Sequence, residues 1–301
     1  MTADPRPLCA LTIAGSDSGG GAGIQADLKT FAAHGVHGLC AIAALTAQHT
    51  RGVSAVHLPP AEFLRAQIDA CFADFRVAAV KIGMLANAEL IDVVRTAMVR
   101  HRPPCVVLDP VLVATSGARL LDADALDAMR RLIPHASLLT PNIPEAEWLL
   151  GESIADAAAA EQAMRALLAL GASAVLLKGA HLAAAAGGAA QADIVTDRFA
   201  DGRVAVAFCN PRLPIEGHGS GCTLASAIAA QCVLGQPLPQ ACGEAIAYVA
   251  GALAHSTRPG RGAGAGAFLA YGCCRNVMPE VAQPACWSQP RYNVRLSSLL
   301  C

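Results

Sequence analysis

A glycine-rich segment that ends in a cysteine has the clearest chemical meaning in this sequence. Residues 218–223 read His-Gly-Ser-Gly-Cys-Thr and precede an apolar run typical of a helix. Gly219, Ser220 and Gly221 would place free N–H groups at the positive end of that helix, where they could stabilise a phosphoryl group in transfer. We expect the same position to lower the thiol pKa of Cys222 and to supply a thiolate as a base. Because the chain contains 12 cysteines, the alternative is that Cys222 only packs.

Another glycine cluster occupies residues 14–23, Ala-Gly-Ser-Asp-Ser-Gly-Gly-Gly-Ala-Gly. It lies between an expected strand and an expected helix, so its N–H groups could meet an anion or a polar ligand. No lysine follows it, as a Walker loop requires, and Ile24 stands where a dinucleotide-binding fingerprint has its last glycine. A tight connection without a ligand is the alternative. Asp27 faces inward on the expected helix, so it must pair internally or meet a ligand.

Polar side chains follow three consecutive expected strands. Asp109 follows the first, Asn142 and Glu145 follow the second, and Lys178 follows the third. The carboxyl ends of parallel strands meet at one edge of a sheet, where ligands collect. Lys178 could bind nucleotide phosphates, and the acidic side chains with Asn142 could hold a hydrated magnesium ion. The structural alternatives are a surface lysine at a strand end and a helix-capping box formed by Asn142 and Glu145. Together these residues are typical of phosphoryl transfer.

The elements that must position these residues alternate between short apolar runs and longer helical patterns, which predicts an α/β fold with a parallel sheet. After the first glycine cluster, Ile24, Leu28 and Phe31 lie on one helical face. A late antiparallel hairpin is expected from residues 193–196 and 203–208. We expect buried strands at 11–14, 40–45, 77–82, 105–108, 137–139 and 174–177, and helices at 61–73, 122–133, 222–234 and 240–254.

Composition excludes several classes of protein. The chain has 301 residues, a formal charge of -1, 54% hydrophobic and 15% charged residues, so it is not disordered and has no electrostatic attraction to nucleic acid or to a membrane surface. We find no secretory signal, membrane span or zinc-ligand spacing, and expect a soluble cytoplasmic protein with reduced cysteines. One domain is expected over residues 1–270, with a surface insertion at 183–190 and an irregular cysteine-containing tail at 271–301.

Several motifs in register resemble the hydroxymethylpyrimidine/phosphomethylpyrimidine kinase family of thiamine biosynthesis, over about residues 8–268. The resemblance implies a ribokinase-like three-layer α/β/α fold with a central, mostly parallel sheet and the late hairpin. It also implies ATP-dependent phosphorylation of 4-amino-5-hydroxymethyl-2-methylpyrimidine and then of its monophosphate, with Mg²⁺ and a homodimer. The motifs are residues 13–29, 44–50, 81–85, 108–111, 140–147, 177–181 and 218–223.

The resemblance also implies roles for single residues. Cys222 takes the place of the aspartate base of sugar kinases, and Gly219, Ser220 and Gly221 form the anion hole. ATP and Mg²⁺ are assigned to Asp109, Asn142, Glu145 and Lys178, with Asp109 and Glu145 as the metal ligands. The substrate pocket is assigned to Gly15, Asp27, Gln48, Met84 and Val111, where the Gln48 amide suits an aminopyrimidine edge.

The chain departs from the family pattern at Glu216 and Gly217, which replace neutral polar residues near the nucleotide, and at Ala180, which replaces a glycine. These changes bear on nucleotide affinity more than on catalysis. Two alternatives for the function stay open at this point. One is a pyridoxal kinase of the same fold, and the other is a non-catalytic pyrimidine-binding sensor.

Overall fold

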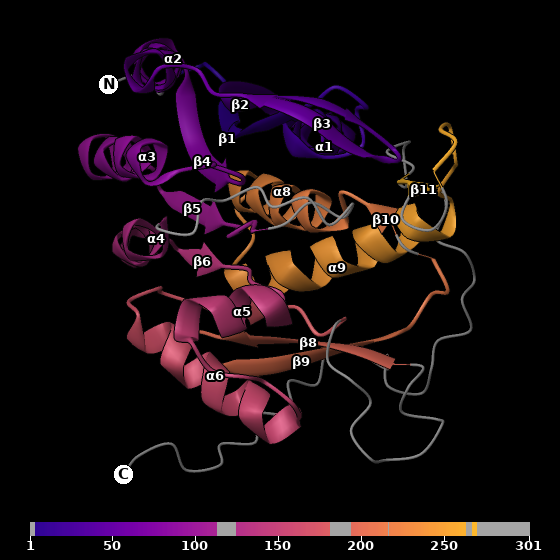
Figure 1. Ribbon diagram of the computed structural model, residues 1–301. Helices are drawn as coiled ribbons and strands as arrows, with labels where there is room; N and C mark the ends of the chain where they lie inside the picture. The colour runs from indigo at the N-terminus through magenta and orange to yellow at the C-terminus, as the bar shows by residue number, and fades with distance from the viewer. Residues whose placement is uncertain (1–3, 113–124, 181–193, 216, 263–266, 270–301) are drawn as a thin grey trace.

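A long sheet runs through the computed structural model, with helices on both of its faces (Figure 1). The structure describes residues 4–112, 125–180, 194–215, 217–262 and 267–269. The expected insertion at 183–190, the tail at 271–301 and Glu216 lie outside the described residues. The α/β class and the three-layer architecture predicted from the sequence are confirmed.

Among the described residues, nine strands form one sheet in the order β3-β2-β1-β4-β5-β6-β7-β8-β9. The strands from β2 to β7 in this order are parallel to one another. At the edges, β3 is antiparallel to β2, β8 is antiparallel to β7, and β9 is antiparallel to β8. The β8–β9 pair confirms the predicted hairpin. The bounds are β1 (Leu8–Asp17), β2 (His37–His49), β3 (Gly52–His57), β4 (Arg76–Ile82), β5 (Cys105–Leu108), β6 (Leu138–Leu139), β7 (Val175–Leu177), β8 (Ile194–Ala200) and β9 (Ala205–Pro211), with a separate pair β10 (Gly217–His218) and β11 (Ala267–Phe268).

The six predicted buried strands are all present, and the largest difference concerns the end of β2. This strand continues past residue 45 to His49 and pairs there with β3. The sequence did not predict β3 because its side chains are mostly exposed and show no apolar period. The extension carries Gln48 beyond the core of the sheet, which places that side chain at a ligand-accessible edge.

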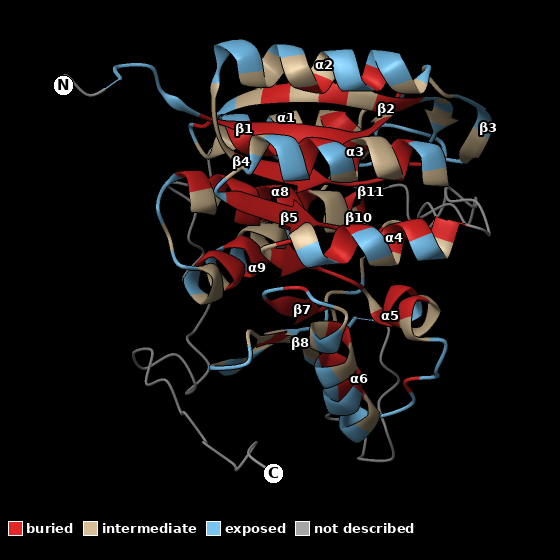
Figure 2. Ribbon diagram, turned by 90° about the vertical axis from the view of Figure 1, so that its left-hand side faces the viewer, coloured by how far each residue is buried: buried red, intermediate tan, exposed pale blue. Residues whose placement is uncertain are grey.

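Helices α1, α8 and α9 cover one face of the sheet, and α2, α3, α4, α5 and α6 cover the other (Figures 1 and 2). Each group buries its apolar side in its own hydrophobic cluster. The predicted helix 122–133 is observed as α4 and a short 3-10 turn, while residues 122–124 lie outside the described residues. The bounds are α1 (Gly23–Ala33), α2 (Ala61–Asp74), α3 (Ala88–His101), α4 (Leu126–Leu132), α5 (Ile143–Leu150), α6 (Ala157–Ala169), α8 (Ser220–Val233) and α9 (Leu238–Ala254).

The central strands are apolar runs because both of their faces are covered. All residues of β5 and β7 are buried, and β1 is buried over nearly its whole length (Figure 2). A strand with one solvated face would alternate apolar and polar side chains, whereas a strand between two helical layers does not. The double coverage therefore holds the strand ends, and the side chains that follow them, in fixed positions.

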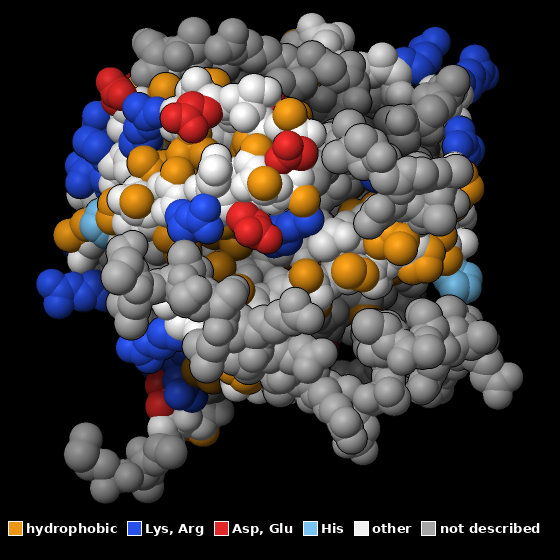
Figure 3. Space-filling model, turned by 90° about the horizontal axis from the view of Figure 1, so that it is seen from below, with side chains coloured by type: hydrophobic (Ala, Val, Ile, Leu, Met, Phe, Trp, Pro, Cys, Tyr) orange, Lys and Arg blue, Asp and Glu red, His pale blue; other side chains and the backbone are white. Residues whose placement is uncertain are grey.

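The surface and the helices add two observations. On the face seen in Figure 3, acidic and basic side chains of described residues lie side by side, in keeping with the near-neutral total charge. No helix in the described part of the chain combines the length and the apolar character needed to cross a membrane.

A buried ion pair joins the first helix to the sheet. Lys81 of β4 donates to Oδ2 of Asp27 of α1 at 2.9 Å, and both side chains are fully buried. The hydroxyls of Thr12 and Ser226 donate to the same carboxylate, each at 2.6 Å, so β1, β4, α1 and α8 meet there. Burial acts to lower the pKa of Lys81, but the charge and the hydrogen bond of Asp27, together with the charge of Asp109, outweigh it and raise the pKa above its usual value. Lys81 therefore stays charged at neutral pH.

We expect Asp27→Asn to lower the free energy of unfolding by about 3 kcal/mol, because Lys81 would keep a buried charge without a counter-ion. Urea unfolding at pH 7 measures this loss. Glu161→Gln on the exposed side of α6 is the control, with an expected change within about 0.5 kcal/mol. In the double variant Asp27→Asn with Lys81→Met, the loss should be smaller than the sum of the two single losses. Additive losses would contradict a mutual role of the pair.

Candidate active site

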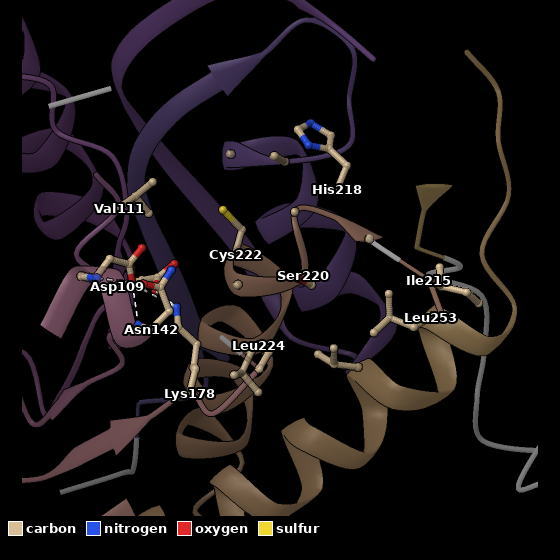
Figure 4. A pocket seen from close by; sticks show the side chains of 18 of the residues that line it. Asp109, Val111, Asn142, Lys178, Ile215, His218, Ser220, Cys222, Leu224 and Leu253 are labelled. Atoms are coloured by element: carbon tan, nitrogen blue, oxygen red, sulfur yellow. Dashed lines mark hydrogen bonds and ion pairs between the residues drawn. The ribbon is translucent and has the colours of Figure 1, made fainter. Parts of the chain in front are cut away.

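A cleft of about 1070 Å³ opens at the carboxyl ends of the parallel strands. This is the edge at which ligands bind in open α/β sheets. The ends of β1, β5 and β7 and the N-terminus of α8 contribute to its wall (Figure 4). Every residue assigned to the site from the sequence lines the cleft except Asp27, namely Gly15, Gln48, Met84, Asp109, Val111, Asn142, Glu145, Lys178, Gly219, Ser220, Gly221 and Cys222.

The first glycine loop (residues 14–23) and the second glycine loop (residues 218–223) touch through their backbones. Gly219 has a φ of +79° and forms the N-cap of α8, which begins at Ser220. A Cβ on Gly219 would lie 2.1 Å from the carbonyl oxygen of Gly21, so no side chain fits between the loops. The first-turn N–H groups of α8 therefore open on the cleft, where they can bind an anion.

Cys222 lies in the first turn of α8 and is partly exposed to the cleft. In Figure 4 its sulfur points into the space between Val111 and His218. The expected fall of its pKa is wrong. Burial raises the pKa of Cys222 to about 11, and the charges of Asp27 and Asp109 add to this rise, while Lys81 acts against it. Desolvation beside two carboxylates thus exceeds the helix-terminus effect, and the ligand-free chain holds a neutral thiol at pH 7.

Lys178, at the end of β7, is shared between two carboxylates (Figure 4). Its Nζ donates to Oδ1 of Asp109 at 2.7 Å and lies 3.5 Å from Oε2 of Glu145. Burial acts to lower the pKa of Lys178, but these two charges outweigh it and raise the pKa above its usual value. Burial raises the pKa of Glu145 to about 7, with a further rise from Asp109 that Lys178 opposes. Two carboxyl groups thus face one ammonium group in this cluster.

The predicted capping box is present and keeps this cluster in place. Oδ1 of Asn142 accepts the N–H of Glu145 at 2.9 Å, and Oε2 of Glu145 accepts the N–H of Asn142 at 2.7 Å. The N–H of Lys178 donates to the carbonyl oxygen of Pro141 at 2.9 Å, which joins the ends of two neighbouring strands. The structural and the functional interpretations of Asn142 and Glu145 are therefore compatible, since both side chains cap α5 and line the cleft.

Small and apolar groups form the opposite wall. A Cβ on Gly15 would lie 2.9 Å from Sδ of Met84, so only glycine leaves the wall open there. Met84 packs in a small cluster with Ala44 and Ala86, and Val111 lies against it. Gln48 adds a polar side chain to this wall. A flat ring with one polar edge would fit such a surface.

Asp27 is the one assigned site residue that does not line the cleft. Its carboxylate is fully buried, and Thr12, Lys81 and Ser226 all donate to it. The assignment of Asp27 to the substrate pocket is therefore wrong for this structure, and the internal pairing considered from the sequence is the observed one. The signal for its partner was Lys81, a charged residue within an apolar strand, which requires a counter-ion.

Sequence reasoning missed a buried pair between the two glycine loops. Nε2 of His218 donates to Oδ2 of Asp17 at 2.9 Å, and the same carboxylate accepts the N–H groups of Gly19, Gly21 and Ala22. The signal was Asp17 two residues before a run of glycines, because a carboxylate at such a position commonly accepts N–H groups of the following turn. His218 gave no signal of its own.

The other end of the cleft is largely apolar, and sequence reasoning did not assign it. In Figure 4, Ile215 and Leu253 lie beyond Leu224, on the side of Ser220 away from Val111. The sequence did not indicate this end of the cleft because its residues come from two distant segments, residues 213–215 and α9. Among the described residues, no group of three or more His, Cys, Asp or Glu side chains could hold a metal ion.

Comparison with known proteins assigns the chain to a family. The matching family model is described as phosphomethylpyrimidine kinase and covers residues 17–267. The thiamine biosynthesis bifunctional protein ThiED of Geobacter sulfurreducens is 47% identical over 84% of this chain, which spans 51% of that longer protein. The hydroxymethylpyrimidine/phosphomethylpyrimidine kinase of Haemophilus influenzae is 43% identical over 87% of this chain and 96% of its own length.

Solved structures agree with this result. The crystal structure of the phosphomethylpyrimidine kinase from Clostridium difficile 630 has a TM-score of 0.71 at 37% identity, covering 81% of this chain and 98% of that one. The pyridoxal kinase of Staphylococcus aureus in complex with AMP-PCP and pyridoxal has a TM-score of 0.79 at 27% identity, covering 91% and 96%. The resemblance inferred from the motifs is confirmed, and the chain belongs to the phosphomethylpyrimidine kinase family.

Proposed function

We propose that the protein transfers the γ-phosphoryl group of ATP to 4-amino-5-hydroxymethyl-2-methylpyrimidine and then to the resulting monophosphate. The observation that carries this proposal is the position of Cys222. It lies at the N-terminus of α8, in the cleft that the apolar wall, Gln48 and the Lys178 cluster also line. A hydroxyl group held against that wall would meet a phosphoryl group held by the first turn of α8.

The pyrimidine belongs at the wall formed by Gly15, Met84 and Val111. The missing side chain of Gly15 leaves room for a flat ring against the thioether of Met84. The amide of Gln48 offers a donor and an acceptor to the aminopyrimidine edge. Pyridoxal also has a flat ring and a hydroxymethyl group, but its ring lacks the amino group that would pair with this amide. The aminopyrimidine is therefore the better match.

The nucleotide belongs at the other end of the cleft. The apolar side chains of Ile215 and Leu253 suit a base, and the first turn of α8 suits the phosphate that is transferred. Lys178 supplies a positive charge beside that turn, since a Cβ on Gly221 would lie 3.4 Å from its Nζ. The ammonium group would stabilise the charge that develops on the phosphoryl oxygens.

The acidic residues of the Lys178 cluster fit a magnesium ion. Asp109 and Glu145 share one ammonium group, and the charge of Asp109 adds to the rise that burial causes in the pKa of Glu145. Two carboxylates completed by water and phosphate oxygens are a donor set that Mg²⁺ accepts. When bound there, the ion would neutralise charge on the phosphates of the nucleotide.

The side chain of Cys222, in its thiolate form, would accept the proton of the substrate hydroxyl. The hydroxyl oxygen forms a bond to the γ-phosphorus, its proton passes to the sulfur, and the bond from phosphorus to ADP breaks. In the second reaction the acceptor is a phosphate oxygen, which is already largely deprotonated at neutral pH because the second pKa of a phosphomonoester is about 6. Cys222 would therefore matter mainly in the first reaction.

We further propose that residues 1–270 form the kinase domain, and that the protein acts in the cytoplasm as a homodimer. The family model supports the first point, since its match ends at residue 267. Sedimentation of the purified chain would test the oligomeric state.

Steady-state kinetics with ATP and purified protein test the proposed substrate. We expect kcat/KM for the aminopyrimidine to exceed that for pyridoxal by at least about tenfold, because only the former pairs with Gln48. A preference for pyridoxal would make the protein a pyridoxal kinase. Binding of the pyrimidine without formation of ADP would make it a sensor.

Replacing the thiol should separate the two reactions. We expect Cys222→Ala to lower kcat of the first phosphorylation by about 10², the usual effect of losing a general base, and that of the second by less than about fivefold. Because the pKa of Cys222 is about 11, the wild-type rate of the first reaction should also rise with pH between 7 and 9.5. Product formation from each substrate measures both effects.

Cys222→Ser is the matched control for size, and its hydroxyl should not restore the first reaction, because its pKa is too high for a base. Equal losses in both reactions, or a first reaction that is independent of pH over this range, would remove Cys222 from the role of base.

The charge of Glu145 should appear in the stability of the ligand-free protein. Its pKa rises from about 4.5 to about 7 on folding, so the folded chain binds more protons than the unfolded chain between these values. Stability should therefore fall as the pH rises through this window. Glu145→Gln keeps the capping geometry and removes the titration, so it should gain about 2 kcal/mol relative to wild type between pH 5 and pH 8.

Urea unfolding in the presence of EDTA measures this difference. Glu152→Gln, an exposed position just past α5, is the control for loss of one negative charge and should run parallel to wild type. If the free energy of unfolding of Glu145→Gln also changed with pH as that of wild type does, Glu145 would be ionised in the folded chain without a loss of stability.

A further inference from the structure

One ring nitrogen of His218 connects three parts of the site. Its Nε2 lies 2.9 Å from Oδ2 of Asp17 and 3.2 Å from Nε2 of the Gln48 side chain. Asp17 belongs to the first glycine loop, His218 begins the second, and Gln48 comes from the extension of β2. Asp17 and His218 are buried, whereas Gln48 lines the cleft. A buried histidine thus lies behind a side chain that faces the ligand.

The Nε2 of His218 must carry a proton. Burial alone would raise the pKa of Asp17, but hydrogen bonds from His218 and from the N–H groups of Gly19 and Ala22 outweigh it and lower the pKa. Asp17 is therefore a carboxylate at neutral pH, and a carboxylate can only accept hydrogen bonds. It follows that Nε2 of His218 donates to Asp17, whether the imidazole is neutral or charged.

This proton limits how the Gln48 amide can lie. The two ends of an amide have the same shape, so hydrogen bonds determine which end carries the oxygen. With the nitrogen of Gln48 toward His218, two N–H groups would oppose each other at 3.2 Å. The hydroxyl of Thr46 would then share its one hydrogen between Oε1 of Gln48 at 3.1 Å and the carbonyl oxygen of Ser16 at 2.9 Å. Exchanging the two ends of the amide removes the opposed N–H groups and leaves the hydroxyl hydrogen of Thr46 for Ser16 alone.

We propose that His218 is a positioning residue that fixes the Gln48 amide with its oxygen toward His218 and its nitrogen toward Thr46, and so makes the site selective for an amino group on the pyrimidine. In this arrangement the single Nε2–H of His218 is shared between Oδ2 of Asp17 and the amide oxygen of Gln48, Gln48 donates to Thr46, and Thr46 donates to Ser16. The amide keeps one N–H group and one lone pair for a ligand, and their order along the cleft wall is set.

The inference rests on the proposed function for the identity of the ligand. An aminopyrimidine edge has a ring-nitrogen acceptor beside an N–H donor, whereas the 4-oxo compound has a ring N–H donor beside an oxygen acceptor. An amide that turns freely could match both compounds, but a fixed amide matches only one. A mismatch leaves buried polar groups without partners, which costs roughly 10- to 100-fold in kcat/KM.

The test compares 4-amino-5-hydroxymethyl-2-methylpyrimidine with its 4-oxo counterpart in the full chain with ATP. We expect wild type to favour the amino compound by at least about tenfold in kcat/KM. His218→Met removes the donor at nearly constant length and should lower this ratio at least about fivefold. His218→Gln keeps an N–H donor close to the position of Nε2 and should retain most of the ratio. A purely structural role of His218 would lower both rates together and leave the ratio unchanged.

A second pair of variants tests the other end of the chain of hydrogen bonds, in case His218→Met does not fold. Thr46→Val removes the acceptor for the amide nitrogen and should lower the ratio, while Thr46→Ser should keep it. An unchanged ratio in His218→Met or in Thr46→Val, or a wild type that accepts both compounds equally, would overturn the inference while leaving the proposed function intact. A wild type that phosphorylates neither pyrimidine would instead overturn the proposed function, and with it the inference.

Discussion

Close packing between the two glycine loops sets the distance between the two ends of the site. Gly219 meets the carbonyl oxygen of Gly21, and a Cβ on Gly23 would lie 2.3 Å from the carbonyl oxygen of Gly15. Both glycines have positive φ values, +79° and +57°, which other residues rarely adopt. Three backbone segments therefore converge where side chains would hold them apart. This convergence brings the N-terminus of α8 to the carboxyl end of β1, so the anion-binding turn and the wall at Gly15 face the same cleft.

The charges around them distinguish Lys81, inside the sheet, from Lys178, at the cleft. Lys81 and Asp27 form what we call a saturated pair. The Asp27 carboxylate accepts hydrogen bonds from Lys81 and from two hydroxyl groups, and both charged side chains are fully buried. Lys178 faces two carboxylates and keeps 12% of its side chain exposed. A saturated buried pair has nothing left to offer a ligand, whereas an unbalanced cluster at a cleft gains from a cation or a phosphate that enters. The same reasoning explains why Asp27 is excluded from the pocket although it lies in a site motif.

Much of this arrangement could be predicted because it follows from local patterns. Apolar runs without alternation predicted the buried parallel strands, and the spacing of Asn142 and Glu145 predicted the capping box. The strand-end positions of Asp109 and Lys178 predicted that they would meet at one edge. What could not be predicted depends on contacts between distant segments. The partner of Asp27 is 54 residues away and that of Asp17 is 201 residues away, and no local period relates such positions. The predicted fall in the pKa of Cys222 was wrong for the same reason. The helix start is a local feature, whereas the burial of the thiol and the carboxylates around it depend on distant segments.

The raised pKa of Cys222 is consistent with a base that must remain inactive until a substrate arrives. An aspartate at this position would add a third negative charge near Asp27 and Asp109, and Lys81 is already paired. A neutral thiol avoids that cost, because burial penalises only its charged form. A neutral thiol also does not accept a proton from a water molecule beside the nucleotide, so it does not promote hydrolysis of the nucleotide. In the proposed mechanism the price is a small thiolate population at neutral pH, which would limit the first reaction and spare a second one whose acceptor oxygen has already lost its proton. The thiol thus suits a site that must discriminate between an alcohol and water.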